Sequence, residues 1–217
     1  MTEEARLREQ ICALARSMFD RGLTHGSTGN ISARTPDGGM LVSPTGTCFG
    51  RLDPARLARF DARGVQIDGD RPTKEMALHM AFYETRNRTA AVVHLHSCHA
   101  VALSTLPDAD SDSFLPPLTP YAFMQLGHVR LLPYFRPGDP QIGAAVRGLA
   151  GRRTAVMLAN HGPVVAGLDL EGACNAVEEL EATARLALLL QGQTPNRLSP
   201  EQVAELVRLH DIAWGDA

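Results

Sequence analysis

The chain has 217 residues, of which 44% are hydrophobic and 21% are charged, and its formal net charge is -3. This length is enough for a single domain, residues 1–217, that buries about 70% of its unfolded surface. The composition is typical of a globular protein and excludes a disordered or fibrous chain. The 21 basic residues, with Lys74 the single lysine, are spread along the chain. They form no clustered basic face, so we expect no nucleic-acid partner.

Hydropathy and cysteine spacing bear on the cell compartment. No apolar run approaches the roughly 20 residues that are needed to cross a bilayer, so we expect a cytoplasmic protein with no membrane partner. The cysteines are scattered and include no C-x-x-C pair, which favours reduced core thiols over a disulfide framework or a cysteine zinc site. They are Cys12, Cys48, Cys98 and Cys174.

Apolar spacing and turn residues predict the elements of the first half of the chain. Loops rich in small polar residues precede and follow the first predicted hairpin. The predicted elements are a helix at 3–21, strands at 31–34 and 40–43 with a turn at 36–39, a short helix at 53–57, a small hairpin around 68–70, and a helix from Pro72 to about Thr85. Glu75 therefore lies near a helix N-terminus.

The second half alternates apolar strands with helices. Residues 114–120 are too rich in proline for either element. The predicted elements are a strand at 90–96, a helix at 97–106, a strand at 129–132, a helix from 139, a strand at 154–159 interrupted by a loop at 160–163, a helix at 170–191, and a last helix that opens with a capping box at 199–202. This pattern predicts an α/β fold with three layers, α/β/α, in which helices cover a mixed, largely antiparallel sheet.

Three histidines form a candidate metal site. Side chains alternate between the faces of a strand, so His94 and His96 point the same way, about 7 Å apart along the strand, as two ligands of one ion require. His161 follows the next apolar strand, where Gly162 and Pro163 would fix the loop so that its side chain reaches the same end of the sheet. Three imidazoles with one open position is the ligand count of a catalytic zinc site.

Glu75 is the candidate acid or base of this site. Near a helix N-terminus and beside a dication it should ionise easily, so it could be a fourth ligand or a proton carrier once substrate displaces it. His79, one turn further along the same helical face, and His99, after the strand, are competing ligands. The alternative reading is that His94 and His96 are partly buried strand residues bonded to backbone, and that Glu75 is solvated.

Two small-residue loops are candidates for binding an anion. Residues 26–30 and 45–46 combine glycines, which allow close backbone approach, with hydroxyl and amide donors that suit phosphate oxygens. Neither matches a P-loop or a dinucleotide fingerprint, so ordinary turns remain the alternative. Lys74 suits binding of a phosphate or carboxylate, or a solvent-facing position, better than it suits a Schiff base.

Five short motifs stand in order along the chain: Gly-Asn-Ile-Ser at 29–32, Ser-Pro-Thr-Gly at 43–46, Thr-Lys-Glu at 73–75, Val-His-Leu-His-Ser at 93–97 and Asn-His-Gly at 160–162. Together they resemble the class II aldolase/adducin family over nearly the whole chain. The resemblance implies one Zn²⁺ per subunit held by His94, His96 and His161, with Glu75 as a further ligand and acid/base. It also implies substrate contacts from Ser27, Asn30, Thr45, Gly46, Thr73 and Lys74.

The pair Thr73-Lys74 differs from the two small hydroxyl residues usual in the sugar-phosphate aldolases of that family. It looks more like the branch that decarboxylates 3-oxo-tetronate 4-phosphate to dihydroxyacetone phosphate and carbon dioxide. Both reactions leave an enediolate that zinc stabilises. A class II aldolase acting on a sugar phosphate similar to L-fuculose 1-phosphate is the alternative, with Tyr121 as a second proton-transfer group. A non-catalytic adducin-like module is the third hypothesis.

The resemblance also implies an assembly. Members of the family suggest a homotetramer with sites near subunit interfaces, so Tyr121 or the C-terminal helix could serve a neighbouring chain. We therefore expect a lyase that acts on a small phosphorylated keto acid or ketose.

Overall fold

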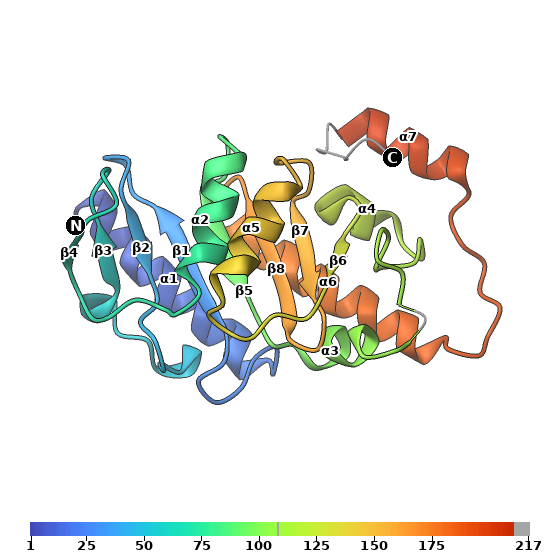
Figure 1. Ribbon diagram of the computed structural model, residues 1–217, viewed down its shortest axis with the longest axis horizontal. Helices are drawn as coiled ribbons and strands as arrows, with labels where there is room; N and C mark the ends of the chain where they lie inside the picture. The colour runs from blue at the N-terminus through green and yellow to red at the C-terminus, as the bar shows by residue number, and fades with distance from the viewer. Residues whose placement is uncertain (108, 211–217) are drawn as a thin grey trace.

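Figure 1 shows the computed structural model of the chain, which describes residues 1–107 and 109–210. Among these residues, eight strands form one sheet in the order β4-β3-β2-β1-β5-β8-β7-β6. The strands are β1 (Asn30–Arg34), β2 (Met40–Val42), β3 (Ala58–Phe60), β4 (Gln66–Asp68), β5 (Ala91–His94), β6 (Arg130–Leu132), β7 (Ala155–Leu158) and β8 (Gly162–Gly167). Neighbouring strands are antiparallel except β6 and β7, which are parallel. The prediction of a mixed, largely antiparallel sheet is confirmed.

Helices cover both faces of the sheet (Figure 1). The helices are α1 (Glu3–Asp20), α2 (Met76–Thr85), α3 (Cys98–Ser104), α4 (Pro120–Leu126), α5 (Pro140–Gly148), α6 (Leu170–Leu189) and α7 (Pro200–His210), with 3₁₀ turns η1 (Phe49–Arg51) and η2 (Pro54–Arg56). The helices α2 and α5 pack on one face, and α1 and α6 lie on the other. This arrangement confirms the predicted three layers. Within the described ranges, no helix is both long and apolar enough to span a membrane.

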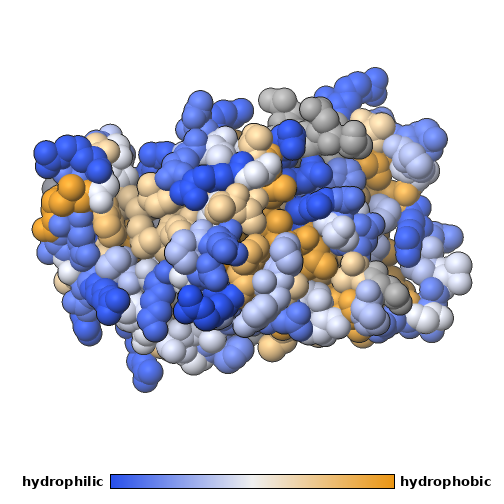
Figure 2. Space-filling model, viewed as in Figure 1, coloured by the Kyte–Doolittle hydropathy of each residue, from blue (hydrophilic) through white to orange (hydrophobic). Residues whose placement is uncertain are grey.

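The two faces of the sheet carry separate apolar cores, because strand side chains alternate. In β5, Val93 packs in the core beneath α1 and α6, whereas Val92 packs in the core beneath α2 and α5. In β7, Met157 and Val156 divide in the same way. Central strands buried on both faces read as continuous apolar runs, which is why they could be recognised in the sequence. Figure 2 shows polar side chains over most of the outer face in view, with apolar patches between them.

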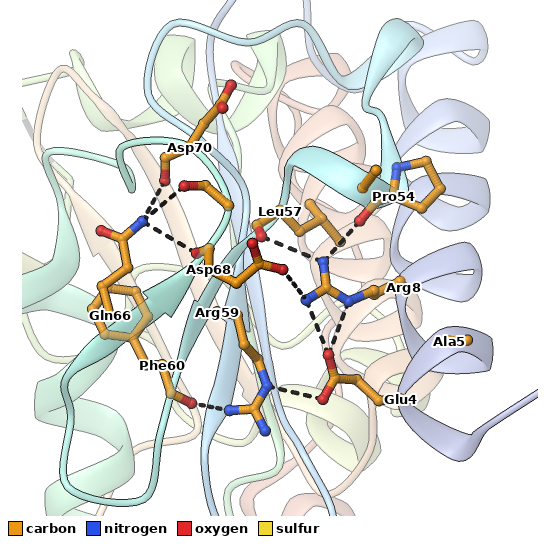
Figure 3. Close-up of polar contacts among 12 residues, drawn as sticks. Glu4, Ala5, Arg8, Pro54, Leu57, Arg59, Phe60, Gln66, Asp68 and Asp70 are labelled. Atoms are coloured by element: carbon orange, nitrogen blue, oxygen red, sulfur yellow. Dashed lines mark hydrogen bonds and ion pairs between the residues drawn. The ribbon is translucent and has the colours of Figure 1, made fainter.

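Ion pairs fix the start of α1 against the β3–β4 end of the sheet (Figure 3). Glu4 accepts hydrogen bonds from Arg59 (2.9 Å) and Arg8 (3.0 Å), and Arg8 also donates to the carbonyl of Pro54 (2.9 Å). Arg59 is buried, and it also donates to the carbonyl of Phe60 and pairs with a second carboxylate, that of Asp37, at 2.5 Å. Pairing of this kind is what makes a buried guanidinium tolerable.

The segment around Pro72 differs from the prediction that it forms the first helical turn. Pro72 lies opposite Pro44 in an isolated β-bridge, and two backbone hydrogen bonds of 3.2 and 3.0 Å tie residues 71–73 to residues 43–45. This pairing holds the segment extended, so α2 begins only after Glu75, which is its N-cap residue. A contact distant in sequence has overridden the local preference of proline for a first helical turn.

Two further predictions about loops need correction. The turn of the hairpin predicted around 68–70 lies at 61–65, between β3 and β4, where Asp61 accepts the backbone N–H groups of Arg63 and Val65 at 2.9 Å. The loop predicted at 160–163 is only a short turn, because β8 already begins at Gly162.

The proline-rich segment at 114–120 includes the start of the helix α4. Regular structure was expected to be absent across 114–120, yet Pro120 is the first residue of α4. Thr119 caps this helix, since its hydroxyl accepts the N–H of Ala122 at 3.4 Å. A threonine cap followed by proline is a recognisable helix start.

Gly162 is the first residue of β8 and lies beside the end of β5, where there is no room for a side chain. A Cβ at this position would lie 2.0 Å from the carbonyl oxygen of Leu95 and 3.2 Å from Cε1 of His94. The close pairing of these two strands therefore depends on glycine.

We predict that Gly162→Ala lowers the free energy of unfolding by about 1–3 kcal/mol, because the added methyl group must push the two strands apart. The matched control is Gly148→Ala at the end of α5, where no heavy atom lies within 4 Å of a new Cβ. The control should keep its stability or gain up to about 1 kcal/mol from helix propensity. Urea unfolding of both variants measures the difference, and equal midpoints would contradict the steric argument.

Candidate metal centre

Four side chains converge at one edge of the sheet. Glu75, His94, His96 and His161 each offer one ligand atom, and these atoms all lie within 4.8 Å of one another. The ring centroids of the three imidazoles are 4.7 to 4.9 Å apart. The predicted set of three histidines and one glutamate is therefore brought together by the fold.

Antiparallel pairing explains why these residues meet. Position 94 ends β5 and pairs with Asn30 at the start of β1, on one side, and with Val164 near the start of β8, on the other. His96 lies two residues past the pairing, and His161 immediately precedes β8. The end of β5 is thus flanked by the starts of both of its neighbours.

The ring of His94 is held by the backbone of β8. Its Nδ1 lies 2.9 Å from the carbonyl oxygen of Pro163 and donates a proton to it, because a carbonyl can only accept. This hydrogen bond leaves the lone pair on Nε2, which faces Glu75 Oε2 at 3.4 Å. A histidine whose other ring nitrogen is bonded to a carbonyl is typical of metal ligands.

Burial keeps two of the imidazoles neutral. It lowers the pKa of His96 to about 3 and that of His161 to about 4, with the neighbouring His94 adding to both shifts. Both rings therefore carry a free lone pair at neutral pH. A metal ion needs its histidine ligands in this deprotonated form.

Glu75 is a buried carboxylate that stays ionised. Burial raises the pKa of its carboxyl group, but interaction with His94 and a hydrogen bond from Asn30 outweigh this and bring the pKa below its usual value. Asn30 Nδ2 donates to Oε2 at 2.8 Å, and Oε1 lies 3.5 Å from His161 Nε2. The two carboxylate oxygens are thus inequivalent, since only Oε2 has an amide donor.

The cluster has the electron pairs that a cation would use. In the described part of the chain, four buried side-chain atoms that lack a hydrogen-bond partner belong to it: Glu75 Oε1, His94 Nε2, His161 Nδ1 and His161 Nε2. Leaving a buried polar atom unpaired costs about 1–3 kcal/mol, and coordination would remove that cost for Glu75 Oε1, for His94 Nε2 and for the one nitrogen of His161 that carries the lone pair. Three imidazoles and a carboxylate are a donor set that suits a transition metal such as zinc. These residues therefore fit a divalent metal ion.

A cavity of about 160 Å³ opens beside the cluster and is lined by Glu75, His96 and His161. Its other walls include all six residues that were predicted to contact substrate: Ser27, Asn30, Thr45, Gly46, Thr73 and Lys74. The bridge between residues 43–45 and 71–73 is what brings the second loop to Lys74. A neighbouring hollow of about 520 Å³ shares Ser27 and Gly46 and carries Arg51.

The loop before β1 approaches the metal centre closely because it contains Gly29. This residue has φ 83°, and a Cβ there would lie 2.9 Å from the carbonyl oxygen of His94. Only glycine combines that backbone conformation with so close an approach. The glycine therefore lets the 25–29 loop form one wall of the cavity.

The competing histidines have other partners. His79 is fully buried, with Nδ1 2.7 Å from the hydroxyl of Ser32 and Nε2 2.5 Å from Asn30 Oδ1. His99 Nδ1 lies 2.7 Å from Glu181, which also accepts the N–H groups at the start of α3. Both rings are therefore engaged away from the cluster.

Tyr121 lies apart from the cavity. It is in the first turn of α4, its side chain is 59% exposed, and it is not among the residues that line the cavity of its own chain. Its role as a proton-transfer group stays a prediction and requires a neighbouring subunit.

Residues of the β6–α5 loop also line the cavity, although the sequence did not single them out. Pro137 and Gly138 form part of its wall, and Gly138 has φ 78°. A new Cβ on Gly138 would lie 3.3 Å from the Cβ of Lys74. The proline-glycine turn signal was visible, but nothing local indicated that it faces Lys74.

Comparison with known proteins places the chain in a family. Residues 9–188 match the family described as Class II Aldolase and Adducin N-terminal domain. The 3-oxo-tetronate 4-phosphate decarboxylase of Escherichia coli (strain K12) is 46% identical over 203 residues, covering 94% of this chain and 96% of the relative. The L-fuculose phosphate aldolase of the same strain is 31% identical, covering 86% and 84%.

A solved structure agrees with these relatives. The crystal structure of YgbL from Escherichia coli is 45% identical and matches with a TM-score of 0.92, covering 94% of this chain and 99% of that one. The chain therefore belongs to the class II aldolase and adducin N-terminal domain family.

Proposed function

We propose that this chain, as a single domain over residues 1–217, is a metal-dependent lyase that decarboxylates 3-oxo-tetronate 4-phosphate to dihydroxyacetone phosphate and carbon dioxide. The observation that carries the proposal is the cavity in which the Glu75 carboxylate and two imidazoles of the cluster face Lys74 and the two small-residue loops. The high identity to decarboxylases of this substrate supports the same choice.

The reaction asks for charge stabilisation and for one proton. The bond between C1 and C2 breaks, carbon dioxide leaves, and the electron pair stays on C2 beside the C3 carbonyl. A divalent ion held by His94, His96 and His161, which we take to be Zn²⁺, supplies the positive charge that stabilises those electrons. Glu75 is the group that moves the proton.

The geometry of Glu75 suits this role. Its oxygen Oε2 is engaged by Asn30, whereas Oε1 has no hydrogen-bond partner within the described residues. Oε1 is therefore the oxygen that can accept a proton from solvent or substrate and pass it to C2. The same oxygen can coordinate the ion before substrate arrives.

The loops provide the binding site for the phosphate. Ser27, Thr45, Gly46 and Thr73 line the cavity and offer backbone and hydroxyl donors that suit phosphate oxygens, and Lys74, which also lines it, adds a positive charge. Thr73 is preorganised, because its Oγ1 accepts the N–H of Glu75 at 3.3 Å. One short segment thus joins phosphate binding to proton transfer.

The alternative is an aldolase of sugar phosphates. The same electron pair on a carbon beside a carbonyl is left when an aldehyde departs, and L-fuculose phosphate aldolase is a relative at 31% identity. That reaction needs a second proton-transfer group, for which Tyr121 is our candidate. A non-catalytic adducin-like module is disfavoured because the cluster retains a complete set of ligand atoms.

We further propose a cytoplasmic homotetramer in which Tyr121 serves the cavity of a neighbouring subunit. The exposure of Tyr121 supports this role. In a cyclic assembly, every subunit would then complete the site of the next one.

The first test is turnover by the metal-loaded protein. We expect 3-oxo-tetronate 4-phosphate to yield carbon dioxide and dihydroxyacetone phosphate, and a chelator to abolish this by removing the ion that stabilises the electron pair. Fuculose 1-phosphate is run alongside. Cleavage of the sugar phosphate alone would show that the protein is an aldolase. No turnover of either substrate by zinc-, manganese- or cobalt-loaded protein would support the hypothesis of a non-catalytic module.

Substitutions separate the metal ligands from the proton carrier. Glu75→Gln should keep the ion but lower kcat by about 10²–10⁴-fold, because an amide cannot carry the proton. Loss of an outer-shell contact typically lowers metal affinity by about 10–100-fold, and His96→Ala, which removes a ligand, should lower it further. The controls are Glu84→Gln, an exposed carboxylate on α2, and His99→Ala, outside the cluster. Elemental analysis and turnover measure both effects, and a fully active Glu75→Gln enzyme would remove its role.

Mixing two inactive variants tests the role of Tyr121. In the alternative aldolase reaction, which needs the second proton-transfer group, random assembly of Glu75→Gln and Tyr121→Phe subunits should restore about a quarter of the wild-type cleavage activity, because one subunit then supplies the carboxylate and its neighbour the hydroxyl. Coexpressed tetramers, with their mass checked by light scattering, provide the measurement. Full activity of Tyr121→Phe alone, or inactive mixed tetramers, would exclude a tyrosine that acts between subunits.

A further inference from the structure

The strand β1 and the helix α2 carry matching ladders of polar residues. Along β1, Asn30 and Ser32 lie on one face, two residues apart, and on α2 the residues Glu75, His79 and Tyr83 are spaced by four. Two strand residues advance about 6.7 Å and four helical residues advance about 6.0 Å, so the two ladders stay nearly in step. Each polar side chain of the strand can therefore meet two from the helix.

The contacts form one continuous chain of hydrogen bonds. Tyr83 OH lies 2.9 Å from Ser32 Oγ, and Ser32 Oγ lies 2.7 Å from His79 Nδ1. His79 Nε2 lies 2.5 Å from Asn30 Oδ1, and Asn30 Nδ2 lies 2.8 Å from Glu75 Oε2. All five side chains are buried, between 0% and 7% exposed. No other polar group is needed to link Tyr83 to the carboxylate.

The donors and acceptors can be arranged in only one direction. The ionised carboxylate of Glu75 only accepts, so the amide nitrogen of Asn30 must face it and the amide oxygen must face His79. His79 must then donate from Nε2, and in the neutral ring, which burial favours by lowering its pKa to about 3, the lone pair is left on Nδ1 to accept from Ser32. Ser32 in turn accepts from Tyr83. Protons and tautomers are thus fixed by the network itself.

We propose that His79, held by Ser32 and Tyr83, is a positioning residue that fixes the amide of Asn30 as a donor to Oε2 of Glu75. The inference deepens the proposed function and rests on the role of Glu75 in it. Oε1, which lies 3.5 Å from His161 Nε2, is thereby left as the carboxylate oxygen without a hydrogen-bond partner among the described residues.

Loss of the hydrogen bond from His79 to Asn30 would change the metal site without removing any candidate metal ligand. If His79 could not donate, the buried Oδ1 of Asn30 would lose its partner, and nothing would hold the amide group in the position from which Nδ2 donates to Glu75. The carboxylate would lose its buried donor and would no longer hold Oε1 in one place. Outer-shell contacts of this kind typically change affinity or activity by about 10–100-fold.

The variants follow from the atoms that each side chain retains. His79→Leu removes both nitrogens, whereas His79→Gln places an amide donor near the position of Nε2. Ser32→Ala removes the hydroxyl that selects the tautomer of His79. Thr183→Val is the matched control, since it removes a fully buried hydroxyl from α6 that hydrogen-bonds to Glu179, outside the network.

We expect His79→Leu and Ser32→Ala to lower kcat by about 10–100-fold while KM and the bound metal stay within about threefold. His79→Gln should recover most of the loss, and Thr183→Val should match the wild type. A general packing defect would not be rescued by glutamine. Unchanged kcat in both His79→Leu and Ser32→Ala, or equal losses in His79→Gln and His79→Leu, would overturn the proposal.

A second readout does not depend on turnover. In NMR spectra of metal-free protein labelled with ¹⁵N-histidine, the signals that disappear in His79→Gln are those of the His79 ring. They should report a neutral ring with its proton on Nε2, and Ser32→Ala should weaken the preference for that tautomer. A wild-type proton on Nδ1 would overturn the proposal even if His79→Leu fails to fold. If metal-loaded wild type turns over no substrate while the Nε2 proton is seen, the proposed function fails and the positioning network stands.

Discussion

The charged carboxylate of Glu75 is 7% exposed, and burying such a group is costly unless donors or opposite charge replace the water it loses. One amide from β1 supplies part of that compensation. The nearby imidazoles of His96 and His161 have pKa values of about 3 and 4, so they are neutral and cannot supply it. A divalent cation would satisfy the carboxylate and the free imidazole lone pairs together. The requirement to hold this charge explains why buried polar side chains link β1 to α2 within otherwise apolar cores.

Pairing within the sheet collects the parts of the site, and one irregular contact adds the rest. The order β1-β5-β8 places the loop before β1, the end of β5 and the turn before β8 at one edge. The bridge between Pro44 and Pro72 then joins a second loop to the segment that leads into α2. Substrate loops and metal ligands thus meet because short extended segments pair, and no long insertion is required.

Local pattern predicted much of the fold and of the site. The strand predicted at 90–96 placed His94 and His96 together, although β5 ends at His94 and His96 lies two residues beyond it. Helical spacing placed Glu75 near the start of α2. Pro72 was assigned wrongly because its pairing partner lies 28 residues away, which no local signal shows. The orientation of the His79 ring depends on Ser32 and Asn30 of another element, so sequence spacing alone left it as a competing ligand. The role of Tyr121 stays a prediction, because its own chain does not bring it to the cavity.

The sequence separation of the ligands also affects the order of events during folding. Only His94 and His96 are close in the unfolded chain, and His161 joins them after closure of a loop of some sixty residues, which is entropically unfavourable. Such non-local pairing is characteristic of slowly folding β topologies. We therefore expect an ion to enter a site that the folded sheet has already built, whereas in small zinc domains the metal organises the chain.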